Sequence, residues 1–279
     1  MATAMPTASV HPLVQPAGYM PGWIARRTAP PAEALQTGLA GLVELLGGTP
    51  DASCAASAER FLIHRVARGG ALVHEGARAD MLYVVHSGSF KCVKTAEDGY
   101  EHVLAFAWRR DLIGYDGLAG AHYAFSAIAL EDSRVVALPL SAFDALRHHA
   151  EPLDAALQNL LSRQLAHAGE IAEVMAAVAA DVRLARFLVQ LSARMAERGQ
   201  SPRRLLLRMN RRDIANHLGL AHETISRSFR VLADRGWLRV NNRELELLDL
   251  ESLRHYARST RGVVDEAMHH DHVPLVHAA

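Results

Sequence analysis

The spacing of apolar residues changes along the chain, and each change predicts a different kind of structure. Residues 1–32 carry six prolines and little periodicity, which is typical of a disordered N-terminal arm. Leucines at helical spacing over Ala34–Gly47, with Gly48 after them, predict a short helix. Residues 61–140 instead show short apolar runs separated by glycines. We expect strands at the following segments: Met81–Val85, Ser89–Thr95, Glu101–Ala107, Phe125–Leu130 and Arg134–Leu138.

Closely spaced short strands with glycine turns favour an all-β roll or barrel for this part of the chain. From Ser141 onward the apolar period becomes helical. The segment Glu151–Ala180 has no proline after its first turn and repeats apolar positions at alternating intervals of four and three residues. This heptad spacing predicts a coiled-coil seam formed by the following residues: Leu153, Leu157, Leu160, Gln164, His167, Ile171, Val174 and Val178. One helix cannot bury such a seam alone, so we expect it to pack on the β-domain, on a second copy of itself, or on both.

A second helix is expected over Val182–Arg198, followed by a helix-turn-helix unit that begins at Arg211. Asn210 is a suitable N-cap for its first helix. Numbered from Arg211, the small fifth residue is Ala215, the turn residue at position nine is Gly219 and the apolar fifteenth residue is Ile225. The two helices cross at the fifth position, and the ninth must accept the turn between them, so the sequence meets the constraints of this motif. A helical hairpin with a purely structural role is the alternative.

A β-hairpin should follow the helix-turn-helix. Trp237–Val240 and Glu244–Leu248 read as strands, and Asn241-Asn242 suits the positive backbone angles of a tight turn. The sequence therefore predicts an α+β chain with an N-terminal double-stranded β-roll, a long dimerisation helix and a C-terminal winged helix-turn-helix. We place the domains at 1–32 (arm), 33–150 (β-roll), 151–180 (dimerisation helix), 181–258 (winged helix-turn-helix) and 259–279 (flexible tail).

Charge supports nucleic acid as the partner of the C-terminal domain. The whole chain has a formal net charge of zero, with 30 basic and 30 acidic residues. Between Ser201 and Arg243, however, ten arginines stand against Asp213, Glu223 and Asp234, which leaves a local charge of +7. A basic module of this kind is the electrostatic signature of a DNA-binding domain.

The second helix of the unit should offer one face to DNA bases. Glu223, Ser226 and Arg227 share that face, since they lie at i, i+3 and i+4. Arginine can bind guanine through two hydrogen bonds, and glutamate can accept one from cytosine. A helix N-terminal acid favoured by the dipole is the alternative for Glu223. We expect phosphate contacts from the following residues: Arg211, Arg212, His222, Thr224, Arg230 and Arg243.

A glycine-punctuated β-roll, a long seam helix and a C-terminal winged helix-turn-helix, in that order, resemble the CRP/FNR family over roughly residues 55–250. The stretch LVQLSARMAERGQSP (188–202) and the stretch MNRRDIANHLGLAHETISR (209–227) look closest to the FNR branch. The Glu-x-x-Ser-Arg signature of that branch is present as Glu223, Ser226 and Arg227. The resemblance implies a cyclic-nucleotide-binding-like jelly roll and a homodimer that reads TTGAT-N4-ATCAA. It also implies contact of the roll and the reading domain with RNA polymerase, as in an activator.

The sensor departs from that family. An iron–sulfur cluster of the FNR type needs about four thiolates, and this chain has two cysteines, Cys54 and Cys92. In relatives that bind cyclic AMP, an arginine faces the phosphate, whereas the corresponding stretch here, residues 123–126, reads Tyr-Ala-Phe-Ser. We therefore expect neither a four-cysteine cluster nor cyclic AMP, and the cofactor stays unknown. Sixteen histidines leave haem open as an alternative.

These features of the sequence leave three candidate functions. The first is a ligand- or redox-responsive dimeric regulator in which pairing of the seam helices re-aims two recognition helices. The second is a constitutive regulator with a non-functional sensor pocket. The third is an enzyme with a cupin-like site, but the roll lacks the closely spaced histidines and carboxylate that such a site needs, so we expect no enzyme. The absence of an evident export signal or membrane span leads us to expect a cytoplasmic protein.

Overall fold

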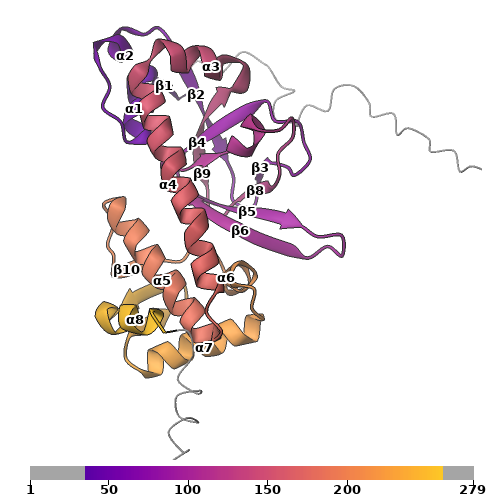
Figure 1. Cartoon of the computed structure of the whole chain (residues 1–279), viewed down its shortest axis with the longest axis vertical. Coiled ribbons are helices and arrows are strands. Elements are labelled where there is room, and N and C mark those ends of the chain that lie inside the picture. Colours follow the sequence, from indigo (N-terminus) through magenta and orange to yellow (C-terminus); the bar gives the residue numbers. More distant parts are fainter. Residues whose placement is uncertain (1–34, 260–279) are drawn as a thin grey trace, which may run out of the picture. The chain divides into compact units, whose positions relative to one another are not determined.

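A computed structural model describes residues 35–259 of the 279-residue chain. The predicted N-terminal arm (1–32) lies outside the described residues, as does the predicted tail except for Ser259. The element order along the described part follows the sequence expectation of a β-roll, a long helix and a winged helix-turn-helix (Figure 1).

The glycine-punctuated region forms two antiparallel sheets that pack against each other. The first sheet has the order β1-β2-β9-β4-β7 and consists of β1 (Gln36–Gly38), β2 (Arg60–Val66), β9 (Ser133–Pro139), β4 (Met81–Ser87) and β7 (Leu112–Ile113). The second has the order β3-β8-β5-β6 and consists of β3 (Ala71–Val73), β8 (Ser126–Ala129), β5 (Ser89–Thr95) and β6 (Glu101–Trp108). A core shared by both sheets includes Tyr83 and Val135 from the first and Phe90 and Ala127 from the second, so the expected roll is confirmed.

The start of the described chain corrects one prediction. Only Leu39–Leu46 of the helix expected over Ala34–Gly47 is helical, as α1. Gln36–Gly38 instead pairs with β2, and Leu35 is half exposed rather than part of the buried leucine stripe. Thr37 and Gly38 are weak helix formers, and pairing with β2 satisfies their backbone, so the strand competes successfully here.

Short helical segments complete the roll: α2 (Ala52–Ala56), the 3-10 turn η1 (Tyr115–Leu118) and α3 (Leu140–His149). The long helix α4 (Glu151–Met175) then packs its N-terminal half on α1 and α3. It is five residues shorter than the predicted helix, because the chain turns at Ala176–Ala179 before α5 (Ala180–Glu197). The turn is closed by the Ala176 N–H donating to the Ala172 carbonyl. Within residues 35–259, no helix is long and apolar enough to cross a membrane.

The C-terminal part is a compact winged helix-turn-helix, which we call the reader. It contains α5, β10 (Arg204–Leu206), α6 (Arg211–Leu218), α7 (His222–Asp234), β11 (Leu238–Asn241), β12 (Glu244–Leu247) and α8 (Leu250–Ala257). The three strands form one antiparallel sheet in the order β10-β12-β11. Its hairpin turn places Asn242 at φ 54°, as the Asn-Asn pair predicted, whereas the short strand β10 was not foreseen.

Candidate nucleic-acid interface

The first helix of the reading unit is fixed at both ends by hydrogen bonds that the sequence predicts. The Asn210 side chain accepts from the Asp213 N–H at 2.8 Å, and the Asp213 carboxylate accepts from the Asn210 N–H at 3.1 Å. This reciprocal pair is a capping box, which satisfies two backbone donors at the start of α6. At the other end Gly219 adopts φ 61°, and the Leu220 N–H donates to the Ala215 carbonyl. The glycine thus supplies the left-handed turn that separates α6 from α7.

The second helix, α7, buries one face and exposes the opposite one. Ile225 and Leu232 are fully buried and Phe229 nearly so, and they share a core with Ile214 and Leu218 of α6. This packing fixes the rotation of α7 about its own axis. The residues predicted to read bases, which lie between these buried positions, must therefore point outward.

All three predicted base-reading residues are exposed. The Ser226 hydroxyl donates to the His222 carbonyl at 3.1 Å, a local bond that leaves its oxygen able to accept. Glu223 and Arg227 are four residues apart but form no ion pair, and in the described part of the chain neither side chain has a hydrogen-bond partner. An unpaired acid and an unpaired base on one exposed helix face are available to a ligand that offers both donors and acceptors, such as a base pair.

The predicted phosphate-binding residues differ in their exposure and in the contacts that their side chains already make. Arg212 and His222 are exposed, whereas Thr224 and Arg243 are half-buried. Arg230 lies 3.9 Å from Asp234 with both side chains largely exposed, so this pair adds little stability. Arg211 stacks with its guanidinium carbon 3.4 Å from the Phe229 ring centre, and burial lowers its pKa. Phe229 therefore holds the guanidinium group of Arg211 beside the start of α6.

The reader docks on the β5–β6 hairpin of the roll through polar contacts that sequence reasoning missed. Lys91 Nζ of β5 lies 3.1 Å from Glu101 Oε2 and 3.1 Å from Asp213 Oδ1. Asp213 is 7% exposed at its side chain, so its charge is neutralised by Lys91 inside the contact. Asn216 of α6 donates to the Glu101 carbonyl at 3.0 Å and accepts from the Tyr100 hydroxyl at 3.1 Å. Because these partners lie about 115 positions apart, no local pattern could have indicated them.

His217 occupies the centre of this contact. Its Nδ1 lies 3.0 Å from the Val103 carbonyl oxygen, which can only accept, so the geometry requires a proton on Nδ1. Its ring centre is 5.0 Å from that of Phe106 in β6 and 5.5 Å from that of Phe187 in α5. Burial between these rings lowers the pKa of His217, and the positive charge of Arg194 lowers it further.

The depressed pKa of His217 predicts that acid weakens the fold. The unfolded chain takes up a proton near pH 6.5, whereas the folded chain resists it, so stability should fall as pH drops through that value. Substituting His217→Gln keeps a neutral donor for the Val103 carbonyl and removes the titration. We expect the loss of thermal midpoint between pH 7.5 and pH 5.5 to be smaller in the variant. Equal losses in both proteins would contradict this reading of His217.

The predicted seam of α4 mostly makes contacts within its own chain, which is one of the alternatives that its spacing left open. Leu153, Leu157 and Leu160 pack inside their own chain against α1 and the first sheet of the roll. Gln164, His167 and Ile171 line a cavity of the same chain, and Val174 is buried in the reader core. Val178 is 72% exposed but lies beyond the end of α4. The residues predicted as a seam therefore mostly fill intramolecular contacts, which heptad spacing alone cannot distinguish from intermolecular ones.

A neighbouring stripe of α4 stays open. It has the same heptad spacing, shifted by one residue, and consists of Leu161, Leu165, Ala168, Ala172 and Met175. Leu165 is 77% exposed and Met175 is 39% exposed. We call this set the α4 stripe. Leu165 is thus a large apolar side chain exposed in the middle of a long helix, with Leu161 and Ala168 one turn before and after it.

The cavity beside α4 tests whether the roll could hold a cyclic nucleotide. It measures about 290 Å³, and its lining combines aromatic and aliphatic side chains with a few polar groups. Tyr115 and Phe125 line it where a phosphate would need a cation. Nearby, the buried Oδ1 of Asp116 has no hydrogen-bond partner within residues 35–259. The arginine in the lining is Arg194, which is already bound to Glu170 at 3.0 Å. These residues do not fit a cyclic phosphate, because an unpaired charge would be buried beside a carboxylate.

The described residues offer neither a cluster of metal ligands nor an exposed thiol. Among residues 35–259, no three histidine, cysteine or acidic side chains gather closely enough to hold a metal ion. Cys54 and Cys92 are both buried free thiols, and burial raises the pKa of Cys92 to about 12. Cys54 is enclosed with the leucines of α1.

The two sheets, the long helix and the reader define a class of protein, the transcription regulators that couple a sensor-type β-roll to a winged helix-turn-helix. Comparison with known families agrees. The model of the cyclic nucleotide-binding domain matches residues 63–149, and the model of the Crp-like helix-turn-helix domain matches residues 182–256. Relatives with these domains are transcription regulators, not enzymes. The chain belongs to the CRP/FNR family.

Individual relatives place the chain within that family. It is 34% identical over 190 residues to the transcriptional regulatory protein btr of Bordetella pertussis, an alignment that covers 68% of this chain and 78% of that protein. It is 33% identical over 198 residues to the fumarate and nitrate reduction regulatory protein of Escherichia coli K12, covering 71% and 79%. Among solved structures, FixK2 of Bradyrhizobium japonicum shares the fold with a TM-score of 0.64 and 23% identity, covering 72% of this chain and 99% of that one.

Proposed function

We propose that this chain acts as a homodimer that binds an inverted repeat of the form TTGAT-N4-ATCAA and regulates transcription there. The observation that carries the proposal is the outward display of Glu223, Ser226 and Arg227 on a helix whose other face is buried in the core. Within residues 35–259, Glu223 and Arg227 have no partner on that face. Each copy would place α7 in the major groove of one half-site. Arg227 would bind guanine, and Glu223 would accept a hydrogen bond from a cytosine amino group.

The dimer would form along the α4 stripe. Two copies of α4 related by a two-fold axis would bury Leu165 and the alanines that follow it, which an isolated chain leaves exposed. Pairing in this way holds the two readers at a fixed separation, and half-sites about one helical turn (~34 Å) apart require such a separation. By family analogy, the bound dimer would contact RNA polymerase and act as an activator.

Operator binding tests the proposal directly. Fluorescence anisotropy should show tight binding to a duplex with the inverted repeat. It should show much weaker binding when the G·C pair of each half-site is reversed, because each wrong base pair costs about 1–3 kcal/mol. Equal affinity for the two duplexes at the same salt concentration would rule out sequence reading by α7.

Arg212 should behave differently from the base-reading residues. Its side chain is exposed in the first turn of α6, where a phosphate would be held, so Arg212→Ala should weaken cognate and random DNA by similar factors. The slope of log affinity against log salt should fall by about one unit per reader, because one fewer counterion is released. The measurement is a salt series for both duplexes. A loss confined to the cognate duplex would instead make Arg212 a base contact.

The cavity beside α4 favours a responsive regulator over a constitutive one. Among the described residues, the buried Oε1 of Gln164 and the buried Nε of Arg194 have no hydrogen-bond partner, so a donor and an acceptor on a small, mostly apolar molecule would satisfy both. His217 of α6 also lines this cavity, so a molecule bound there would contact the reader directly. The absorbance spectrum of the purified protein tests whether it binds haem. Comparing the operator affinity of aerobic and anaerobic protein tests whether it senses redox state. Affinity that no added molecule or oxygen changes would support the constitutive form.

A further inference from the structure

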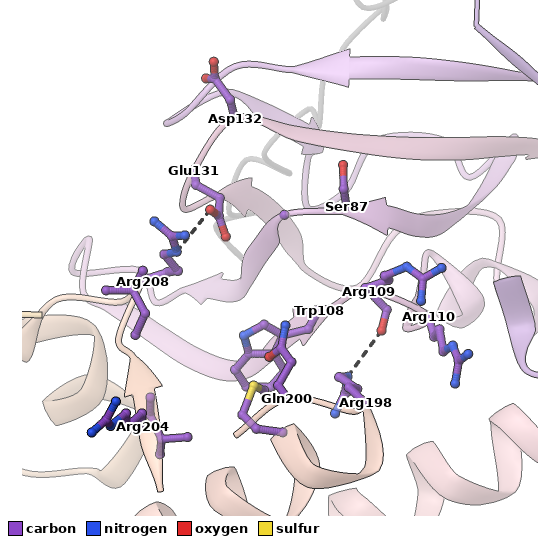
Figure 2. A pocket seen from close by; sticks show the side chains of 14 residues that line it. Ser87, Trp108, Arg109, Arg110, Glu131, Asp132, Arg198, Gln200, Arg204 and Arg208 are labelled. Carbon is purple, nitrogen blue, oxygen red and sulfur yellow. Dashed lines mark hydrogen bonds and ion pairs between the residues drawn. The ribbon is translucent and has the colours of Figure 1, made fainter. Parts of the chain in front are cut away.

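A second cavity, distinct from the one beside α4, lies at the junction of the roll and the reader (Figure 2). It measures about 500 Å³ and is bordered by the turns β4–β5, β6–β7 and β8–β9 on one side and by the end of α5 and strand β10 on the other. Trp108 and Met195 contribute apolar surface. Five of the lining residues are arginines: Arg109, Arg110, Arg198, Arg204 and Arg208.

The two acids in the lining are already engaged. Glu131 accepts from the Ser89 hydroxyl at 2.8 Å and pairs with Arg208 Nε at 3.1 Å. Asp132 accepts from Arg65 Nη2 at 2.7 Å and from the Arg68 N–H at 3.0 Å. Glu131 therefore neutralises Arg208 across the cavity, whereas Asp132 is paired with Arg65, outside the lining.

The arginines are engaged unequally. Arg198 is held by both carboxylate oxygens of Asp111, at 2.8 and 2.9 Å, and Arg204 has only a 3.4 Å contact with Glu246 while 81% exposed at its side chain. Among residues 35–259, no carboxylate lies within ion-pair distance of Arg109 or Arg110. The buried Nε of Arg110 likewise has no hydrogen-bond partner in the described part of the chain.

The backbone at this point is also unusual. Arg110 adopts φ 78°, a left-handed conformation that side chains other than glycine rarely take. Arg110 lies in a tight turn closed by the Asp111 N–H, which donates to the Trp108 carbonyl at 2.9 Å, and its own N–H donates to the Val85 carbonyl at 2.9 Å. The carbonyl of Arg109 accepts from Arg198 Nε at 3.3 Å, so the turn of the roll that carries both arginines is tied to the end of α5.

Charge identifies the kind of ligand. The lining residues together with their ion-pair partners comprise seven arginines and four carboxylates, a surplus of three positive charges. A monoanion would leave two of these charges unmatched, whereas a chain of phosphates carries three or more negative charges. Guanidinium groups also match phosphate oxygens geometrically, since they can donate two parallel hydrogen bonds.

We propose that this cavity binds a small molecule that carries a diphosphate or triphosphate group. Arg109 and Arg110, from the roll, and Arg204 and Arg208, from the reader, would bind its oxygens. Because the two sides of the cavity belong to the two functional parts of the chain, the bound polyphosphate would fasten the reader to the roll. This goes beyond the proposed DNA binding and does not depend on which operator the reader recognises.

Isothermal titration of the full chain with inorganic pyrophosphate and with tripolyphosphate tests the proposal. We expect one saturable site per chain, with much weaker binding of inorganic phosphate and a decline in affinity as salt is raised. The double variant Arg109→Gln/Arg110→Gln should lose roughly tenfold in affinity for each arginine, because a hydrogen bond to a charged group is worth about that factor. Titration with ATP separates the sources: tighter binding than tripolyphosphate assigns the site to nucleotides, and equal binding assigns it to the phosphate chain alone.

A control variant separates this site from non-specific charge attraction. Arg78→Gln/Arg254→Gln removes two exposed arginines elsewhere on the chain and should leave pyrophosphate affinity unchanged. The proposal is overturned if tripolyphosphate shows no saturable binding, or if the control loses as much affinity as the Arg109/Arg110 variant while that variant keeps its thermal midpoint.

Discussion

Replacing Arg227 with alanine should weaken binding to the TTGAT-N4-ATCAA duplex by about 1–3 kcal/mol for each half-site, which is roughly fivefold to 160-fold. The effect is large because Arg227 is exposed and unpaired, so its removal deletes a base contact without disturbing the fold. Preference for guanine at the contacted position should relax at the same time. The measurement is anisotropy on duplexes that carry each of the four base pairs at that position.

Arg230→Ala is the matched control for Arg227, since both are exposed arginines on α7. Arg230 lies one turn beyond Arg227 and 3.9 Å from Asp234. As a predicted phosphate contact, its loss should reduce affinity for cognate and random duplexes alike. If Arg227→Ala also weakened the two duplexes equally, the assignment of Arg227 as the guanine-reading residue would be wrong.

Placing a charge in the α4 stripe should have a still larger effect. In Leu165→Glu, two carboxylates would face each other across the paired helices, and a seam of apolar residues would have to bury them. We expect sedimentation to show a monomer. Operator affinity should fall by about 10²–10⁴-fold, because the second half-site is then no longer held at high effective concentration.

Asn159→Glu provides the control for that experiment. Asn159 is also exposed on α4 but lies off the stripe, so the same new charge should leave the dimer and its operator affinity nearly unchanged. A dimer of normal stability in Leu165→Glu would show that the copies pair through a different surface.

The local features of this fold were readable from the sequence. The bounds of α6 agree residue for residue with the prediction, because Asn210 and Gly219 mark its two ends through a cap and a left-handed turn. The strands β5 and β9 were found to within one residue because glycines and alternating apolar positions bound them. In each case the determining interaction lies within a few residues along the chain.

Features that depend on residues far apart in the sequence could not be predicted from local sequence patterns. Heptad spacing on α4 correctly indicated a buried stripe but could not say which partner covers it, and the roll of the same chain covers most of the stripe that was selected. The contact of Lys91 with Asp213 and the arginine cavity around Trp108 arise only when segments far apart in sequence meet. The sequence shows that the reader is rich in arginine. Only the structure shows which of these arginines line the cavity and which are free to face DNA.

The mass of the protein–operator complex, measured by sedimentation velocity, tests the central claim most directly. The account predicts two chains bound per duplex on the inverted repeat, and no stable complex at the same concentrations when the G·C pair of both half-sites is reversed. A complex of one chain per duplex, or complexes of equal stability on the two duplexes, would contradict it.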